Sequence, residues 1–480
     1  MLYELFFNID YQCLQGNMNQ SIEDICYDSR QVKRHCLFVC LQGWKDDGHC
    51  YIDEAIAKGA SVIVIEKEVV MHDHITYILV KDSRLALALL SDAFFDYPSS
   101  KLKVIGITGT KGKTTVAYMI ASILEAAGEH VGMIGTIGCF IGGKKYQSVN
   151  TTPESYEIQK MMAIMIEQNC TYCIMEVSSQ GLKYHRVDGI QFDYAIYTNL
   201  SIDHIGTYEH PTFEDYKTSK QKLFQMTPFS IVNQDDPYYS QMLSQHYLTY
   251  SLHQQSHLQA SHIQYIQNQF LSVQFQTQGL FQDTFLINIP GQFNVYNALA
   301  AITFASHLHI PLLTIQYALS HLCIPGRTEM ILHPSYTVMI DYAHNAYSYA
   351  HLFETLNHYK HCRLICVYGA GGKRDHHRRY EVGKVVAQNH AFSILTADNP
   401  RGEKVSEICS DIIRGIESEQ GKYIVIEDRK QAIFYALKQA QKGDFVLCLG
   451  KGHEDYQIMK EKRLPFSEKK IIENYFMNND

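Results

Sequence analysis

Short apolar runs alternate with amphipathic stretches along most of the chain, and this alternation predicts an α/β protein. The run VIGIT at residues 104–108 is typical of a buried strand, and the runs YCIMEV, YAIYTNL and FSIVN follow it, separated by helical stretches. Continuous apolar runs indicate strands that are covered on both faces, as in parallel sheets. The pattern therefore predicts a mainly parallel sheet with helices on its faces.

Similar patterns flank this region, and they predict three domains, at residues 1–98, 99–324 and 325–480. The first contains the apolar run SVIVIE from Ser61 and ends in the polar DYPSS. The last contains RLICVYGAGG, FSILTADN, KYIVIED and DFVLCLGKG, each running into Gly or Asp, as open sheets with a ligand edge do. We expect an N-terminal α/β domain, a central P-loop ATPase-like domain and a C-terminal Rossmann-like α/β domain.

One Gln- and His-rich stretch, residues 253–276, looks like low complexity at first sight. Leu271, Val273 and Phe275 nevertheless alternate with polar residues, which predicts a half-buried strand. A length of 480 residues also exceeds what a single hydrophobic core usually supports, at about 100 to 200 residues per domain.

Composition and charge narrow the classes of partner. The 42 basic and 50 acidic residues give a net charge of -8, and no Lys/Arg-rich run appears, so nucleic acid is not an expected partner. No basic leader precedes an apolar stretch, and no apolar run approaches the roughly 18 residues of a membrane span. The 13 cysteines are scattered among apolar segments. We expect a cytoplasmic, monomeric protein that acts on small molecules, without a membrane partner.

The sequence GTKGKTT follows the first central strand and carries the clearest chemistry. It consists of Gly109, Thr110, Lys111, Gly112, Lys113, Thr114 and Thr115. An amphipathic helix is predicted over residues 114–127. A strand, a Gly-containing loop and a helix N-terminus direct backbone N–H groups at phosphate oxygens, with a lysine on the outer phosphates and a hydroxyl on a metal ion. The common phosphate-loop spacing is not met, because Ile107 stands where the first Gly is expected.

Three polar residues stand at or just after the ends of later strands of the same region. Glu176 ends YCIMEV, and Asp203 and His204 follow YAIYTNL. A carboxylate and an imidazole at strand ends near a phosphate loop suit a magnesium–nucleotide site, although His is an unusual ligand for so hard a cation. By themselves these residues are equally compatible with structural roles.

The motifs and their order resemble the Mur ligases, and within them the MurE branch. The resemblance covers nearly the whole chain. Its motifs are DSR from Asp28, DGH from Asp47, GTKGKTT, NTTPES from Asn150, EVSSQGL from Glu176, TNLSIDH ending at His204, SKQKLF from Ser219, PGQFNVYNALAA from Pro290, PGRTE from Pro325, DYAH from Asp341, DNPR from Asp398 and GKGHEDYQ from Gly450.

The resemblance implies an ATP-dependent, amide-forming ligase of peptidoglycan synthesis. ATP activates the γ-carboxylate of UDP-MurNAc-L-Ala-D-Glu as an acyl phosphate, and a third amino acid displaces the phosphate. Lys113, Lys220, Glu176 and His204 are the implied catalytic residues. Mg²⁺ is implied at Thr114, Glu176 and His204, with Lys220 carbamylated to hold a second ion.

The resemblance also implies binding residues in each predicted domain. The loop of residues 109–115 and Asn294, Asn297, Arg327, Asp341 and His344 are implied for ATP. Ser29, Arg30, Thr151, Thr152, Ser178 and Arg186 are implied for the uridine-linked muramoyl dipeptide, so that domain 1–98 is the uridine-nucleotide domain. Arg374, Asp398, Asn399, Arg401, Gly450 and Glu454 are implied for the incoming amino acid.

The identity of the amino acid rests on Arg401. A guanidinium pairs with a carboxylate, which the distal end of meso-diaminopimelate carries and lysine lacks. DHIGTYEHPTFEDY instead resembles lysine-adding relatives, so lysine stays an alternative. A MurF-type or folylpolyglutamate-type ligase, and a nucleotide-binding switch that has lost ligation, are further alternatives. NTTPES and DNPR argue against the first two, and the retention of Lys220, Glu176 and His204 argues against the switch.

Overall fold

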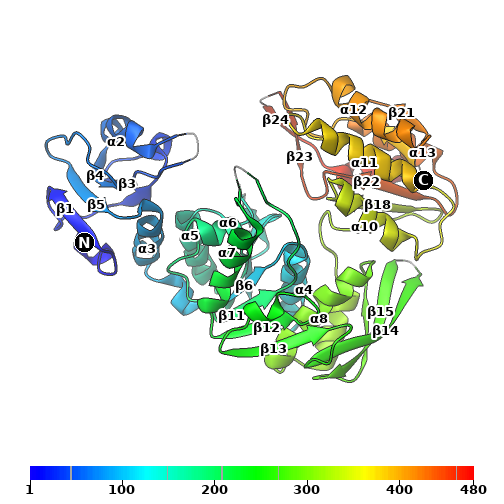
Figure 1. Ribbon diagram of the computed structural model, residues 1–480, viewed down its shortest axis with the longest axis horizontal. Helices are drawn as coiled ribbons and strands as arrows, with labels where there is room; N and C mark the ends of the chain where they lie inside the picture. The colour runs from blue at the N-terminus through cyan, green and yellow to red at the C-terminus, as the bar shows by residue number, and fades with distance from the viewer. Residues whose placement is uncertain are drawn as a thin grey trace. The chain divides into compact units, whose positions relative to one another are not determined.

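The protein folds as two compact units, seen in the computed structural model of Figure 1. Unit 1 comprises Met1–His257 with Thr303–Leu308, and unit 2 comprises Leu258–Ile302 with His309–Asp480. The structure describes residues 1–43, 46–146, 148, 150–206, 209–268, 270–460 and 462–479. The α/β class that the apolar pattern predicts is confirmed in both units, whereas the boundaries proposed at residues 98 and 324 stay predictions.

Unit 1 begins with a sheet in the order β1-β5-β4-β3-β2, in which only the β1–β5 pair is antiparallel. Asp82 caps the helix α3 by accepting hydrogen bonds from the backbone N–H groups of Arg84 and Leu85, both at 2.9 Å. The elements are α1 (Leu2–Leu5), β1 (Tyr11–Gln15), β2 (Asp24–Cys26), β3 (Cys36–Val39), α2 (Ile52–Lys58), β4 (Ala60–Ile65), β5 (Thr76–Val80) and α3 (Ser83–Phe94).

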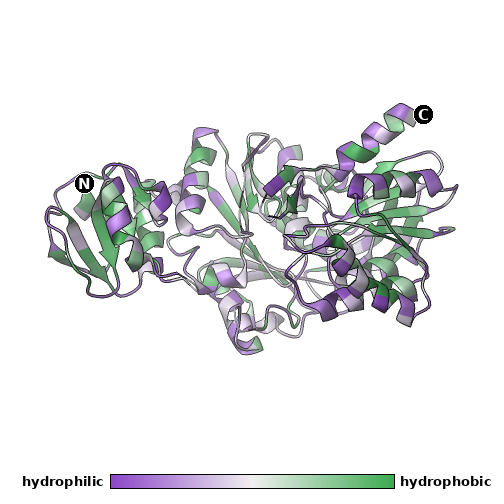
Figure 2. Cartoon of the chain, turned by 90° about the horizontal axis from the view of Figure 1, so that it is seen from above, coloured by the Kyte–Doolittle hydropathy of each residue, from purple (hydrophilic) through white to green (hydrophobic). Residues whose placement is uncertain are grey.

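The second sheet of unit 1 has the order β13-β12-β11-β6-β10-β7-β8-β9, and its strands from β13 to β7 are parallel. The elements are β6 (Lys103–Thr108), α4 (Lys113–Ala126), β7 (Val131–Gly135), β8 (Gly138–Ile141), β9 (Lys144–Tyr146), α5 (Ser155–Glu167), β10 (Tyr172–Glu176), α6 (Ser179–Lys183), β11 (Tyr194–Tyr197), α7 (Phe213–Gln225), β12 (Phe229–Asn233) and β13 (His246–Ser251). The predicted strands and the mainly parallel arrangement are confirmed. The strands are drawn mainly in the green of apolar residues (Figure 2).

The helix after the phosphate loop begins at Lys113, one residue before the predicted start. The helix is amphipathic, as predicted, because Val116, Met119, Ile120 and Leu124 on its apolar face are all buried. The helix thus packs on the sheet while its N-terminus stays at the carboxyl edge of β6.

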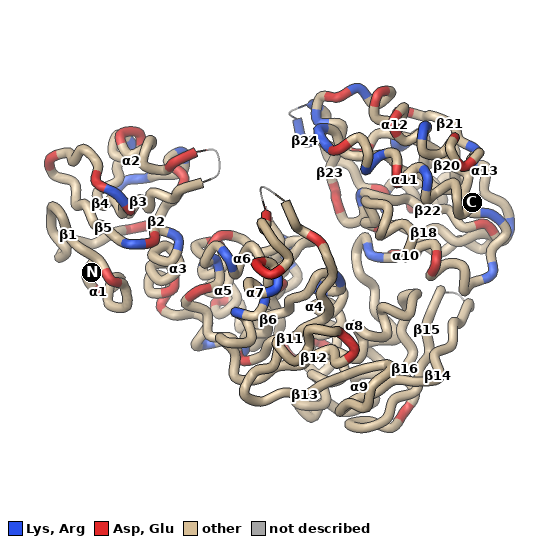
Figure 3. The backbone as a smooth tube through the Cα atoms, viewed as in Figure 1, with Lys and Arg blue, Asp and Glu red and all other residues tan. Residues whose placement is uncertain are grey.

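Unit 2 begins with the antiparallel strands β14 (Leu258–Gln267), β15 (Leu271–Gly279) and β16 (Thr284–Ile287), followed by α8 (Gln292–His307) and α9 (Leu312–Ser320). Leu271, Val273 and Phe275 are buried on β15, which confirms the strand predicted there. Residues 237–326 contain a single acidic residue, Asp283, and no Lys or Arg. The tube around β14, β15 and α9 is accordingly almost free of charge colours (Figure 3).

The main sheet of unit 2 has the order β17-β18-β22-β19-β20-β21, with only β17 antiparallel to its neighbour. The elements are β17 (Glu329–Leu332), β18 (Thr337–Asp341), α10 (Ala346–Leu356), β19 (Leu364–Tyr368), α11 (His376–Gln388), β20 (Phe392–Leu395), α12 (Val405–Ser418), β21 (Tyr423–Val425), α13 (Arg429–Gln439), β22 (Phe445–Leu449), β23 (Tyr456–Met459), β24 (Lys462–Pro465) and α14 (Glu468–Asn479).

Successive residues of these strands enter two different hydrophobic cores. Met339 and Leu447 face the core that contains α10, α11 and α12, whereas Val338 and Val446 face the core that contains α13 and α14. Burial on both faces explains why the strands read as continuous apolar runs.

The described helices are too short or too polar to span a membrane, and the cysteines are reduced. Among the helices that the structure describes, none combines the length and the apolar character needed to cross a bilayer. Each of the 13 cysteines is a free thiol, and Cys170 and Cys173 are buried. The thiols in the apolar strands therefore pack as small hydrophobic side chains.

A buried ion pair links α14 to the main sheet of unit 2. Arg429 Nε donates to Glu468 Oε1 at 2.8 Å, and both side chains are almost fully buried. The same guanidinium donates to the carbonyl oxygens of Leu449 at 2.7 Å and Ala397 at 3.3 Å. Arg429 therefore fixes the ends of two segments that lead to Asp398 and Gly450.

We expect Glu468→Ala to lower the free energy of unfolding by about 3–5 kcal/mol, because it leaves a buried guanidinium without its counter-ion. Urea unfolding followed by circular dichroism measures the change. Glu407→Ala is the control, since its pair with Lys404 is exposed on both sides and is expected to contribute little. Equal midpoints for the two variants would contradict a structural role for the buried pair.

Candidate functional site

The phosphate-type loop at the carboxyl end of β6 has a backbone that only glycine accommodates at its first position. Gly109 has a φ of 148°, and a Cβ atom there would lie 1.9 Å from Thr198 Oγ1. Gly112, with a φ of 90°, occupies the N-cap position of α4. The loop therefore turns tightly against β11 and leads directly into a helix N-terminus, which is where backbone N–H groups can bind an anion.

The segment after β11 fixes the loop. Thr110 N donates to the carbonyl oxygen of Asn199 at 2.8 Å, and Lys111 N donates to Asn199 Oδ1 at 3.0 Å. Thr198 Oγ1 donates in turn to the carbonyl oxygen of Lys111 at 2.7 Å. Hydrogen bonds with the end of a neighbouring strand thus hold the loop from one side.

Two lysines contact the same carbonyl oxygen of the loop. Lys113 Nζ donates to Gly109 O at 2.8 Å and to Thr110 O at 3.2 Å, and Lys220 Nζ donates to Gly109 O at 3.0 Å. Lys220 is 1% exposed and lies over the ring of Tyr216. Burial lowers the pKa of Lys220 well below its usual range, and the positive charge of Lys113 lowers it further. A neutral amine at Lys220 can act as a nucleophile.

Glu176, at the end of β10, is enclosed by hydroxyl groups. Thr114 Oγ1 and Thr136 Oγ1 donate to its Oε2 at 2.9 Å and 3.0 Å, and Thr136 N donates to its Oε1 at 3.0 Å. Gly135 permits this approach, because a Cβ atom there would lie 2.3 Å from Glu176 Oε1. The structure thus brings together Thr114 and Glu176, two of the residues predicted to hold magnesium, and their oxygen atoms are the donors that this ion prefers.

The other predicted metal ligands have different partners. His204, with a φ of 57°, has its Nδ1 3.1 Å from Glu209 Oε1, and its side chain is half exposed. Asp203 beside it accepts from Lys111 Nζ at 2.9 Å. Within the described part of the chain, no cluster of three or more His, Cys, Asp or Glu side chains is arranged to hold a metal ion. The predicted ligand set differs from such a cluster because it draws on Thr114 and Lys220.

Four of the six residues predicted for the muramoyl dipeptide lie close together in unit 1: Thr151, Thr152, Ser178 and Arg186. Thr152 Oγ1 lies 3.0 Å from Ser178 Oγ, and Arg186 Nη1 donates to the carbonyl oxygen of Thr152 at 3.0 Å. Thr151 Oγ1 lies 3.0 Å from Thr136 Oγ1, which joins this group to Glu176. Arg186 also pairs with Glu154 at 2.8 Å. A hydroxyl-rich surface with a guanidinium therefore adjoins the carboxylate of Glu176.

Ser29 and Arg30, predicted for the uridine diphosphate, have local partners on α2 and in the segment after β2 of unit 1. Ser29 Oγ donates to Glu54 Oε2 at 2.9 Å and is buried. Arg30 pairs with Asp28, with Nε donating to Oδ1 at 2.8 Å, and its side chain is 82% exposed. The guanidinium of Arg30 therefore faces solvent, whereas the hydroxyl of Ser29 is buried.

The remaining residues predicted for ATP belong to unit 2, where they form local groups. Asn297 Nδ2 donates to Asn294 Oδ1 at 2.9 Å near the start of α8. The guanidinium of Arg327 lies 5.0 Å from the centre of the Tyr342 ring. Asp341 accepts from Thr328 N and Ala343 N, both at 2.7 Å, and burial raises its pKa. His344 Nδ1 lies 2.9 Å from the carbonyl oxygen of Tyr342.

Four of the six residues predicted for the amino acid gather at the carboxyl edge of the main sheet in unit 2. Asn399 Nδ2 donates to Glu454 Oε2 at 2.8 Å. A fully buried lysine, Lys451, donates to Glu454 at 2.9 Å and to Asn399 at 3.3 Å, and its ammonium lies 3.6 Å from Asp398. Gly450, with a φ of 103°, would place a Cβ atom 3.4 Å from Asp398. The site thus holds two carboxylates around one buried cation.

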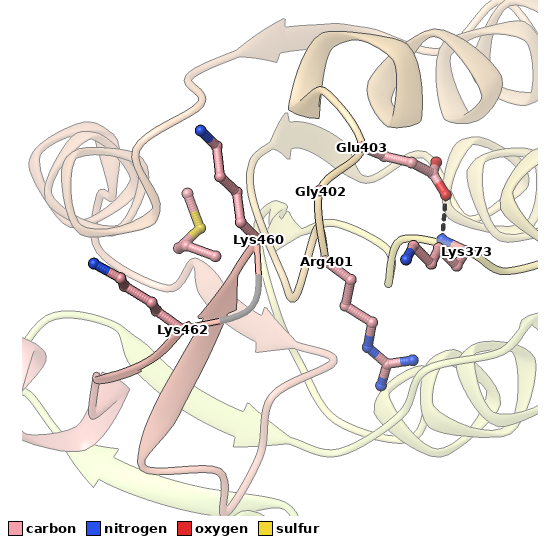
Figure 4. Close-up of a pocket in the computed structure, with 7 residues that line it drawn as sticks. Lys373, Arg401, Gly402, Glu403, Lys460 and Lys462 are labelled. Atoms are coloured by element: carbon pink, nitrogen blue, oxygen red, sulfur yellow. Dashed lines mark hydrogen bonds between the residues drawn. The ribbon is translucent and has the colours of Figure 1, made fainter.

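Arg401 lies at a cavity of about 620 Å³, whereas Arg374 is exposed and does not line it. The cavity is lined by Lys373, Arg401, Gly402, Glu403, Met459, Lys460 and Lys462. In Figure 4 the side chain of Arg401 points away from those of Lys460 and Lys462, and Glu403 is hydrogen-bonded to the backbone of Lys373. Four cations against one carboxylate favour an anionic group in this cavity.

Sequence reasoning missed several residues of these groups. Thr136 follows β7 and bonds Glu176, but no motif marks it. Lys451 stands inside the quoted GKGHEDYQ segment, so its position was visible while its burial was not. Asp203 and Lys111 were each named, but their ion pair was not expected.

Comparison with known proteins adds a family to this geometry. Three family profiles match in succession: "Mur ligase family, catalytic domain" at residues 21–95, "Mur ligase middle domain" at residues 107–305 and "Mur ligase, glutamate ligase domain" at residues 326–452. The chain is 42% identical over 475 residues to a protein of Caldanaerobacter subterraneus subsp. tengcongensis named UDP-N-acetylmuramoyl-L-alanyl-D-glutamate–2,6-diaminopimelate ligase, covering 97% of each chain.

Solved structures agree with these matches. A structure described as a UDP-N-acetylmuramoyl-L-alanyl-D-glutamate–2,6-diaminopimelate ligase has a TM-score of 0.70 and 27% identity, covering 100% of this chain and 99% of that one. A MurF structure from Acinetobacter baumannii has a TM-score of 0.64 at 19% identity, covering 99% and 98%, and shares the fold.

We expect Gly109→Ala to weaken nucleotide binding by about tenfold or more, because the new methyl group displaces the loop from Thr198. Titration with a fluorescent ATP analogue measures the dissociation constant. Gly128→Ala is the matched control, since its φ of 88° is also positive but a Cβ atom there meets nothing within 4 Å. Equal losses in both variants would show that backbone strain, rather than the clash, is responsible.

Proposed function

Because this chain belongs to the Mur ligase family, we propose that it is an ATP-dependent amide ligase that joins meso-2,6-diaminopimelate to UDP-MurNAc-L-Ala-D-Glu in peptidoglycan synthesis. The observation that carries the proposal is full-length identity of 42% to a ligase of that name, together with the gathering of Asp398, Asn399 and Glu454 at one sheet edge. A carboxylate does not react with an amine unless it is first activated, and ATP supplies the activating phosphoryl group.

We propose that the loop of residues 109–115 binds the phosphates of ATP through its backbone N–H groups. Lys113 then turns its ammonium from the loop carbonyls to the outer phosphates, and the N-terminus of α4 adds positive potential. Phosphoryl transfer depends on such positioning and charge neutralisation more than on covalent chemistry.

The oxygen atoms of Thr114 and Glu176 fit a magnesium ion, and His204 would complete the set from the loop after β11. When bound, magnesium neutralises phosphate charge in the transition state. The hydroxyl groups of Thr114 and Thr136 meanwhile orient the carboxylate of Glu176 by donating to the same oxygen.

Lys220 is proposed to be carbamylated. Its amine is buried, and its lowered pKa leaves it neutral, which is the form that adds to carbon dioxide. The amine nitrogen forms a bond to the carbon of carbon dioxide and releases one proton to solvent, so the resulting carbamate is an anion with two oxygen atoms. Lys220 would then change from a donor on Gly109 O to a residue that could hold a second magnesium ion. Proximity to the positive charge of Lys113 favours this anion over the ammonium.

The cation-lined cavity supports diaminopimelate as the third amino acid. The distal end of diaminopimelate carries a carboxylate beside its ammonium, and Arg401, Lys373, Lys460 and Lys462 would attract that carboxylate. The lysine side chain ends in an ammonium alone, which these cations would repel. We further propose that Glu454 and Asp398 bind the amino group of the incoming molecule. Lysine stays the alternative substrate.

A MurF-type or folylpolyglutamate-type ligase and a nucleotide-binding switch have less support. The likeness to a MurF structure is at 19% identity and reflects the shared fold, and a nucleotide-binding switch would not require the buried Lys220. We propose that the enzyme acts as a monomer in the cytoplasm, where ATP and its small-molecule substrates are available.

The proposed reaction predicts a product of defined mass. Incubated with UDP-MurNAc-L-Ala-D-Glu, ATP and magnesium, the protein should form the tripeptide with meso-diaminopimelate and little or none with L-lysine. Mass spectrometry of the product distinguishes the two. Product from lysine alone would overturn the assignment of the amino acid, and no product from either would overturn ligation.

The variant Arg401→Gln tests separately whether Arg401 selects diaminopimelate. The loss of a charged hydrogen bond to the distal carboxylate should raise KM for diaminopimelate about tenfold or more, with KM for the dipeptide unchanged. Steady-state kinetics with each substrate varied in turn measures both constants. Arg414→Gln is the control, because that side chain pairs with Asp411 and does not line the cavity. An unchanged KM for diaminopimelate in the Arg401 variant would show that another group binds its carboxylate.

A further inference from the structure

A buried histidine next to the candidate site has no role in the proposed chemistry. His210 is fully buried, with its Nδ1 2.6 Å from Asp215 Oδ2 and its Nε2 2.9 Å from Ser179 Oγ. Lys183 Nζ lies 2.7 Å from the same oxygen of Asp215. Ser179, His210, Asp215 and Lys183 form one continuous chain of hydrogen bonds, which we call the His210 network.

The bonds of this network define the state of the imidazole. Burial lowers the pKa of His210, which leaves the ring neutral at neutral pH even though its bond with Asp215 acts in the opposite direction. A neutral ring has one donor and one acceptor, so we assign the proton to Nδ1, which donates to the carboxylate of Asp215. Nε2 then accepts from the hydroxyl of Ser179.

The network joins three elements, and each of them carries a residue of the candidate site. Ser179 is the first residue of α6, directly after Ser178, which caps that helix and contacts Thr152. His210 N donates to the carbonyl oxygen of His204 at 3.1 Å. The side chain of Asp215 lies on α7, and its carbonyl oxygen accepts from Ser219 Oγ at 2.7 Å, one residue before Lys220.

The arrangement is not that of a nucleophilic serine. Ser179 is 4% exposed and His210 is fully buried, so a substrate carbonyl cannot approach the hydroxyl. Ser, His and Asp in this geometry would otherwise indicate acyl transfer. His210 therefore does not contact substrate, and any effect it has on the reaction passes through the residues to which it is hydrogen-bonded.

We infer that His210 is a positioning residue, which fixes Ser178 for the muramoyl dipeptide and His204 for the magnesium–nucleotide through its bonds to Ser179, Asp215 and the backbone of His204. The inference rests on the proposed function. His210 thereby connects α6 to the loop after β11, so that the hydroxyl of Ser178 and the imidazole of His204 are oriented by the same residue.

Substitutions that keep one bond of the imidazole separate the two connections. The carboxamide in His210→Gln lies near the place of Nε2 and keeps the bond to Ser179, whereas that in His210→Asn lies near the place of Nδ1 and keeps the bond to Asp215. Ser179→Ala removes one hydroxyl and is the mildest change. Ser393→Ala is its matched control. Ser393 is also buried, and its hydroxyl also makes a hydrogen bond to an aromatic side chain, the hydroxyl of Tyr368 at 3.0 Å.

The experiment measures, for each full-length variant, kcat, KM for each substrate and the magnesium concentration at half-maximal rate. Ser179→Ala and His210→Asn should raise KM for the dipeptide about three- to tenfold, as the loss of one buried hydrogen bond does, and leave KM for diaminopimelate unchanged. His210→Gln should keep the dipeptide KM closer to that of the wild type while raising the magnesium requirement. Ser393→Ala should change none of these constants.

Two results would overturn the inference. The first is a fall in kcat with both KM values and the magnesium requirement unchanged, which would show that His210 only maintains the folded fraction. The second is a set of changes of equal size in Ser179→Ala and Ser393→Ala. Absence of product with the wild-type protein in the same assay would instead contradict the proposed function, so the two failures are distinguishable.

Discussion

The carbonyl oxygen of Gly109 accepts hydrogen bonds from the ammonium groups of both Lys113 and Lys220, and the phosphate end of unit 1 is built around this atom. Gly109 reaches this position because its backbone turns against Thr198, where no side chain fits. The turn leads through Gly112 into α4, and it presents its carbonyl oxygen to the buried Lys220. Burial lowers the pKa of Lys220, and the positive charge of Lys113, which bonds the same acceptor, lowers it further. A single backbone geometry therefore underlies both the proposed phosphate binding and the proposed carbamylation of Lys220.

The two parallel sheets use their carboxyl edges in the same manner. In unit 1 the loop after β6, the carboxylate that ends β10 and the segment after β11 converge, and their bonds join Thr114 to Glu176 and Lys111 to Asp203. In unit 2 the ends of β18, β20 and β22 carry Asp341, Asp398 and Gly450. Parallel strands bring the carboxyl ends of distant segments to one side of a sheet, and loops there are free to carry polar groups. A buried lysine contacts each of these edges: Lys220, on α7, donates to Gly109 O, and Lys451, which follows β22, donates to Asn399.

The strands and the phosphate loop could be predicted because their signals are local. Apolar runs define β6, β10 and β12, and the turn residues around Gly109 and Gly112 mark the loop. The contacts of Thr136 with Glu176 and of Lys451 with Asn399 could not be predicted, because they depend on which strands are neighbours and on the register between them. The burial of His210 was hidden for a similar reason, since its partners Ser179 and Asp215 lie on two separate helices. Roles carried over by resemblance, such as those of His204 and Arg374, stay predictions.

The rest position of Lys113 bears on the heat of nucleotide binding. Its ammonium already donates to two carbonyl oxygens of the loop, so in the proposed nucleotide complex a phosphate oxygen would replace protein acceptors rather than water. The number of hydrogen bonds that this group makes then changes little on binding, and the gain comes from exchanging a neutral acceptor for a charged one. The ammonium group would thus have hydrogen-bond acceptors both before and after binding. The protein therefore avoids the free-energy cost of burying an ammonium group without an acceptor.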